Sequence, residues 1–139
     1  MKKLIALTMA LAMIFAFAAC NHEIETSYTV ITEENRVIIY VEATDGATLL
    51  DVMKGLRDDE LLEFTESGGL ITSINGIAGA SDYSTFWALY TTDVEHSNIE
   101  WGDTEYEDKT LGSASLGAKD LHVKSENYYI WEFTSAYGG

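Results

Sequence analysis

Two apolar runs separated by a polar stretch open the strand-like part of the chain near residue 28. The runs Tyr28–Ile31 and Val37–Val41 are rich in β-branched and aromatic residues, which is typical of strands. The polar stretch Glu33-Glu34-Asn35 separates them as a turn. We therefore expect the two runs to form an antiparallel hairpin.

The hydrophobic period changes to that of a helix over residues 48–57. Positions 49, 52, 53 and 56 are apolar and fall on one helical face. Thr48 is a favourable N-cap residue, and Asp51 follows at the spacing of a capping box. Gly55 costs this helix roughly 1 kcal/mol relative to alanine. The pattern predicts one main helix (about 48–57), held in place by its apolar face.

Strand-like runs return after the helix, punctuated by turns. The runs are Leu61–Thr65, Leu70–Ile74, Thr85–Tyr90, Leu121–Lys124 and Tyr128–Phe133. Asn75-Gly76 is a strong turn signal, and the polar, acidic residues 92–110 are expected to form a loop. No proline interrupts any of these runs. The order of elements predicts an α+β fold with one main helix on an antiparallel-rich sheet.

The first residues have the composition of a secretory signal peptide. Lys2 and Lys3 precede a short apolar run that ends at Ala19. This run is shorter than the roughly 20 apolar residues that a membrane-spanning helix needs. We expect export from the cytoplasm, with residues 1–19 removed.

The end of this run, Phe17-Ala18-Ala19-Cys20, resembles the lipobox of bacterial lipoproteins. In that family the cysteine becomes the first mature residue and its sulfur is acylated. The resemblance predicts lipidation at Cys20 and an extracytoplasmic protein, lipid-anchored to the cell membrane. The alternative is ordinary cleavage after Ala18, which would leave Cys20 unmodified. Cys20 is the only cysteine, so no intramolecular disulfide can form.

Composition limits the partners of the mature chain. Removing residues 1–19 takes away two of the 8 basic residues and none of the 23 acidic ones, so the net charge becomes −17. Such a charge excludes nucleic acid as a partner, because phosphates require Lys and Arg. It also disfavours direct contact with anionic lipid. We expect a tether over residues 20–26 and one domain over residues 27–139.

Three segments together resemble a known family. They are Asp45–Met53 (DGATLLDVM), Gly69–Ile77 (GLITSINGI), and Tyr83 followed by Phe86–Tyr90 (FWALY). In their order and their residues, these segments are similar to the motifs of the transcobalamin-like C-terminal domain. In bacteria this domain is carried as the domain of unknown function 4430. The resemblance covers roughly residues 27–134 and implies a β-grasp-like fold.

The family resemblance also implies a ligand. In transcobalamin-like proteins this domain closes over one face of the corrin ring, so the implied ligand is a corrinoid (cobalamin) or another planar compound. The residues expected to contact it are Ser73, Asn75, Tyr83, Phe86, Trp87 and Tyr90. Strand alternation places Trp87 and Leu89 on one face and Phe86, Ala88 and Tyr90 on the other. Trp87 is therefore either core packing against the helix or part of a ligand-stacking surface.

The residues give little support for catalysis or metal binding. No motif of a hydrolase, metalloprotease or phosphate-binding loop occurs, so we expect no enzyme activity and no cofactor. The acidic stretch Asp93–Asp108 offers oxygen ligands that suit calcium, but it lacks the EF-hand spacing. A solvated charged loop is the alternative, and we expect no metal site.

Two functions remain open from the sequence. The first is a surface lipoprotein that captures a corrinoid or similar ligand and presents it to a membrane transporter. The second is a surface interaction module that binds a protein or glycan through strand edges or aromatic residues.

Overall fold

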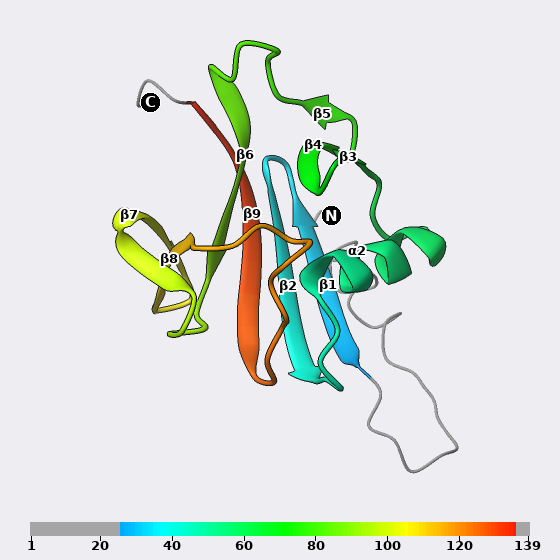
Figure 1. Ribbon diagram of the computed structural model, residues 1–139, viewed down its shortest axis with the longest axis vertical. Helices are drawn as coiled ribbons and strands as arrows, with labels where there is room; N and C mark the ends of the chain where they lie inside the picture. Colours follow the sequence, from blue (N-terminus) through cyan, green and yellow to red (C-terminus); the bar gives the residue numbers. More distant parts are fainter. Residues whose placement is uncertain (1–25, 136–139) are drawn as a thin grey trace.

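The computed structural model describes residues 26–135 (Figure 1). The predicted signal peptide, Cys20 and nearly all of the tether lie outside the described residues. Within residues 26–135, no helix has the length and apolar character needed to cross a membrane.

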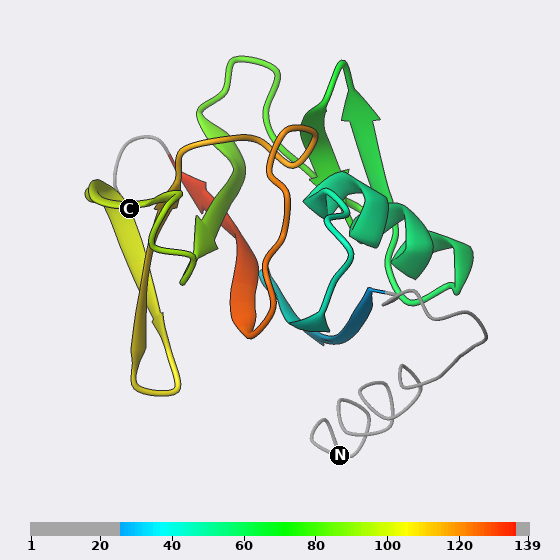
Figure 2. The ribbon, with the colours of Figure 1, turned by 60° about the horizontal axis from the view of Figure 1, so that its bottom comes forward.

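Two antiparallel sheets and one short helix make up the described chain, which confirms the α+β class. The larger sheet has the strand order β1-β2-β9-β6-β8-β7, and the smaller has the order β3-β4-β5. The elements in chain order are β1 (Ser27–Glu33), β2 (Arg36–Ala43), α2 (Leu49–Asp58), β3 (Phe64–Ser67), β4 (Leu70–Ile74), β5 (Ile77–Ala78), β6 (Thr85–Thr91), β7 (Ser97–Tyr106), β8 (Lys109–Ala114) and β9 (Asn127–Ser135). Figure 2 shows α2 and the smaller sheet on one side and the β7–β8 hairpin on the other.

The helix begins where the sequence predicts it. The Asp51 amide donates to Thr48 Oγ1 at 3.1 Å, and the Thr48 amide donates to Asp51 Oδ2 at 3.2 Å, which completes a capping box. The apolar face is buried, and it consists of Leu49, Leu50, Val52, Met53 and Leu56. Packing explains why glycine occupies position 55 of the helix, because a Cβ there would lie 2.6 Å from Tyr28 Oη.

The larger sheet buries side chains on both faces. On the helix side, Val37 and Ile39 of β2 join Trp87 and Leu89 of β6 in the main core around α2. On the other side, a smaller apolar cluster forms around Ile38, Leu111 and Ile130. Leu111 comes from β8, so the β7–β8 hairpin supplies part of the cover of this second face.

The prediction of an acidic loop over residues 92–110 is wrong, because most of it forms the β7–β8 hairpin. The acidic residues of β7 are exposed, and Asp103 and Glu105 alternate with the partly buried Thr104 and Tyr106. Thr104 donates to Glu132 at 2.5 Å, and the Tyr106 ring lies 5.5 Å from the Tyr128 ring. These partners are distant in sequence, so the local composition gave no sign of a strand.

The predicted strand Leu121–Lys124 is also absent, although its alternation is real. Leu121 and Val123 are buried and His122 is exposed. The Leu121 carbonyl accepts from the Leu49 amide at 2.8 Å, and the Val123 amide donates to the Ala47 carbonyl at 2.9 Å. The segment thus packs against the start of α2 instead of joining a sheet, and only an isolated bridge between Thr48 and His122 remains.

Candidate ligand-binding groove

A mostly apolar groove lies where the smaller sheet meets the first half of β6. Its volume is about 420 Å³. The lining residues are Leu70, Ile71, Thr72, Gly79, Ala80, Ser81, Tyr83, Thr85, Phe86 and Trp87. None of these side chains carries a charge, although the sequence has a net charge of −15. The groove is therefore suited to a neutral, apolar group.

Backbone hydrogen bonds hold the walls of the groove together. The Gly79 amide donates to the Thr72 carbonyl at 3.0 Å, and the Ala80 amide donates to the Thr85 carbonyl at 3.1 Å. A Cβ at Gly79 would lie 2.7 Å from the Thr85 carbonyl oxygen, so this close approach requires glycine. Because the wall is tied at several points, the groove is preformed.

A tight turn presents Tyr83 at the rim. Asp82 Oδ1 accepts from the Ser84 amide at 3.0 Å, and the Tyr83 amide donates to the Ala80 carbonyl at 2.9 Å. Tyr83 has a φ of 65°, which few residues other than glycine adopt. Its side chain is 66 % exposed and therefore free to contact a ligand.

Trp87 belongs to the core and to the groove at once. Its side chain is only 7 % exposed, and its ring lies 5.3 Å from that of Phe133. Trp87 Nε1 donates to the Ile77 carbonyl at 2.8 Å, which fixes the indole and satisfies its buried N–H. Phe86 also lines the groove and is 37 % exposed, although strand alternation directs its side chain to the face opposite the Trp87 indole. Of the six predicted contact residues, Tyr83, Phe86 and Trp87 thus line one groove.

Ser73 and Asn75 lie outside this groove. Ser73 lines a separate, more polar hollow of about 790 Å³ together with Arg57 and Glu63. Asn75 shapes the turn after β4: it has a φ of 51°, and its Oδ1 accepts from the Glu63 amide at 3.0 Å. Its amide also donates to the Glu63 carbonyl at 2.8 Å. These contacts give Asn75 a structural role.

Tyr90 lies on the opposite face of the larger sheet. It packs against the cluster of Ile38, Leu111 and Ile130, and burial raises the pKa of its phenol. Strand alternation separates it from Trp87, so the two cannot contact the same face of one ligand.

Leu70 lines the groove but is not among the contact residues predicted from the sequence. It follows the turn glycines Gly68 and Gly69 and is 54 % exposed. The position of this large apolar residue directly after a turn could have marked it in the sequence as a candidate contact residue. Its proximity to Phe86, sixteen positions later, could be found only from the fold.

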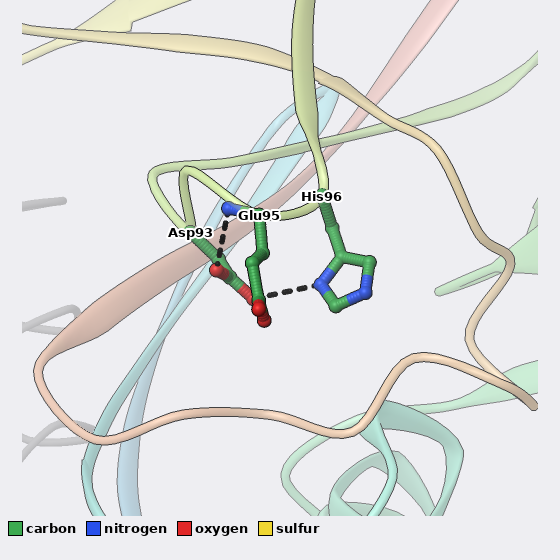
Figure 3. A group of neighbouring side chains, drawn as sticks. All are labelled: Asp93, Glu95 and His96. Atoms are coloured by element: carbon green, nitrogen blue, oxygen red, sulfur yellow. Dashed lines mark hydrogen bonds and ion pairs between the residues drawn. The ribbon is translucent and has the colours of Figure 1, made fainter.

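The acidic stretch does hold one compact cluster of potential metal ligands. Asp93, Glu95 and His96 bring one ligand atom each within 4.8 Å of one another (Figure 3). Asp93 is almost fully buried; His96 Nδ1 lies 3.0 Å from its Oδ2, and the Glu95 amide donates to its Oδ1 at 3.1 Å. Lys124 Nζ lies 3.6 Å from Asp93 Oδ1 and also pairs with Glu95. The ammonium group therefore already supplies a cation to this cluster.

The electrostatics of Asp93 follow from these contacts. Burial by itself would raise the pKa of the carboxyl group. The hydrogen bonds from His96 and the Glu95 amide, with the nearby charge of Lys124, outweigh burial and hold the pKa below its ordinary value. Asp93 is thus a charged structural centre at the start of the β7–β8 hairpin.

Comparisons with known proteins add no further constraint. No protein-family model matches the chain, and no similar protein is found among curated proteins or solved structures.

Proposed function

We propose that this protein is a lipid-anchored, extracytoplasmic binding protein that holds an apolar, planar part of a small ligand in the Tyr83–Phe86–Trp87 groove. The observation that carries the proposal is a preformed groove without charged side chains in a strongly acidic chain. An apolar site with a few convergent polar groups is the usual form of a small-molecule site.

The membrane anchor is the second part of the proposal. It rests on the basic start, the short apolar run and the lipobox-like Phe17-Ala18-Ala19-Cys20. A tether over residues 20–26 would keep the domain close to the membrane, because seven extended residues reach roughly 25 Å at most. This position suits a protein that passes its ligand to a membrane transporter.

The corrinoid is the specific ligand that we propose on the basis of the family resemblance, together with a β-grasp-like description of the fold. A groove of about 420 Å³ is small for a corrin ring, so it would hold one edge of the ring and leave the rest to solvent or to a partner. A helix packed on an antiparallel sheet is compatible with that resemblance.

The proposed role is binding without catalysis. The groove lining offers hydroxyl groups from Thr72, Ser81, Tyr83 and Thr85 but no carboxylate, imidazole, thiol or amine. General acid–base or nucleophilic chemistry would require such groups near the ligand.

The test is a titration of the full-length, detergent-solubilised protein with cyanocobalamin, followed by the visible spectrum and by calorimetry. Nile red, a neutral planar dye, serves as a second probe of the groove. Tyr83→Ala removes the exposed aromatic side chain at the rim and should weaken binding about tenfold, which corresponds to about 1.4 kcal/mol. Val94→Ala, at a residue that is 89 % exposed and not in the lining, is the matched control and should leave binding unchanged.

The two probes test the binding groove and the identity of its ligand separately. Tyr83-dependent binding of Nile red without any response to cyanocobalamin would retain the groove and exclude the corrinoid. Failure of both probes at high micromolar concentration would overturn the proposed binding function.

A further inference from the structure

The outer edge of β7 lacks a neighbouring strand among residues 26–135. β7 is the last strand of the larger sheet and pairs with β8 on one side only. Figure 1 places it at the margin of the molecule, away from α2. Such an edge carries backbone groups that can pair with another chain.

Two large apolar side chains of this edge strand are exposed. Ile99 is 59 % exposed and Trp101 is 65 % exposed, whereas Trp87 and Trp131 are buried. The pairing register with β8 shifts between Asn98 and Asp103, so Ile99 and Trp101 lie in the irregular part of the strand.

The packing of the hairpin defines the direction of the exposed residues. Gly102, Thr104 and Tyr106 face the sheet: a Cβ on Gly102 would lie 3.9 Å from Tyr90, Thr104 donates to Glu132, and the tilted rings of Tyr106 and Tyr128 lie 5.5 Å apart. The exposed residues that alternate with them are Trp101, Asp103 and Glu105. We call these three the Trp101 stripe.

The carboxylates of the Trp101 stripe have no cationic partner among the described residues. Arg36, His96 and Lys124 make the ion pairs of this region, and they pair with Glu33, Glu132, Asp93 and Glu95. Arg36 contacts the carbonyl oxygen of Glu105, at 2.5 Å, and not its side chain. The stripe thus combines an open indole with two unpaired negative charges.

We propose that the Trp101 stripe is a docking surface for an extended, basic segment of another protein. Lys or Arg at alternate positions of that segment would meet Asp103 and Glu105, and a further cation would lie over the Trp101 ring. The Glu105 carbonyl on this edge already accepts from Arg36, so the backbone of the segment would pair with the other outward-facing groups of β7.

Charge excludes other occupants of the stripe. A second copy of this chain would bring like charges together, and an anionic lipid surface would be repelled as well. Charged residues alone would be explained as protection of a sheet edge against aggregation. That explanation does not fit an exposed Trp101 and Ile99, because apolar side chains on an edge favour association.

The test uses the full-length, detergent-solubilised protein and a fluorescein-labelled octapeptide of alternating lysine and threonine. Binding is followed by fluorescence anisotropy at low salt. An octapeptide of alternating glutamate and threonine should not bind. A peptide with the four lysines in one block should bind at least fivefold more weakly, because it cannot match the period of a strand.

Variants separate the stripe from general attraction to an acidic protein. Trp101→Ala and Asp103→Asn/Glu105→Gln should each weaken binding at least tenfold. Glu60→Gln/Glu63→Gln removes the same charge at exposed positions outside the hairpin and should change binding less than twofold. Tyr83→Ala should leave peptide binding unchanged, so this result does not depend on the groove.

Equal weakening by the two double variants, or no effect of Trp101→Ala, would overturn the proposal in favour of non-specific charge attraction. Thermal unfolding of each variant excludes misfolding as the cause, and the exposed Trp101 position should tolerate alanine. Absence of binding by the alternating lysine peptide would also overturn it.

Discussion

Arg36 and Glu132 face one another across β2 and β9, with Arg36 Nε 3.1 Å from Glu132 Oε2. Both then reach the β7–β8 hairpin: Glu132 accepts from Thr104, and Arg36 Nη2 donates to the Glu105 carbonyl. Arg36 also lies over the Tyr106 ring, 5.5 Å from its centre. This ion pair therefore joins the hairpin to the outer face of the larger sheet.

Removing Arg36 should loosen the hairpin. We expect Arg36→Ala to lower the free energy of unfolding by about 1–3 kcal/mol, because Glu132 keeps a partly buried charge without its cation. Urea unfolding measures the change. Lys54→Ala, at an exposed helix position, is the control and should cost less than about 0.5 kcal/mol. An equal loss in the control would contradict this role of Arg36.

For the substitution Gly55→Ala, side-chain packing and helix propensity act in opposite directions. Alanine would be favoured over glycine by roughly 1 kcal/mol in a helix interior. Its Cβ would nevertheless lie 2.6 Å from Tyr28 Oη, so we expect Gly55→Ala to give no gain in stability or to destabilise the protein. Tyr28→Phe removes the hydroxyl group, and Gly55→Ala in that background should recover the gain of about 1 kcal/mol. A full gain from Gly55→Ala alone would show that Tyr28 moves aside.

Asp93 makes stability depend on acid pH. Its pKa in the folded protein is lower than the ordinary value of 3.8, so its contribution is present above about pH 4 and is lost as the pH falls through the folded pKa. We expect Asp93→Asn to destabilise the protein by about 1–3 kcal/mol at pH 7 and to flatten the decline of Tm between pH 5 and 3. Asp58→Asn, which removes an exposed carboxylate, is the control. A steeper acid decline in Asp93→Asn than in the wild type would contradict the stated direction.

The lipid anchor predicts a change of location. Cys20→Ser should move the protein from the membrane fraction to the soluble extracytoplasmic fraction and abolish the mass increment of acylation. Cell fractionation and mass spectrometry of the mature N-terminus measure both effects. A wild-type protein that is cleaved after Ala18 and carries no acyl group would refute the lipoprotein prediction.

Local signals determined the helix and several strands. The 3.6-residue apolar period and the Thr48–Asp51 capping box act within a few residues, so they could be read without any tertiary information. The same holds for the β1–β2 hairpin and for β6, where branched and aromatic residues flank clear turns. The three predicted contact residues that line the groove, Tyr83, Phe86 and Trp87, come from one short segment.

Only the tertiary structure decided the strand order, the hairpin and the full outline of the groove. β9 lies between β2 and β6, and the acidic β7 becomes a strand because Thr104 and Tyr106 find partners on β9. Leu70 joins the groove from another sheet, whereas Tyr90 is directed to the opposite face. The physical reason is the same in each case: hydrogen bonds and apolar burial between segments far apart in sequence outweigh local polarity, and they leave no periodic trace in the chain.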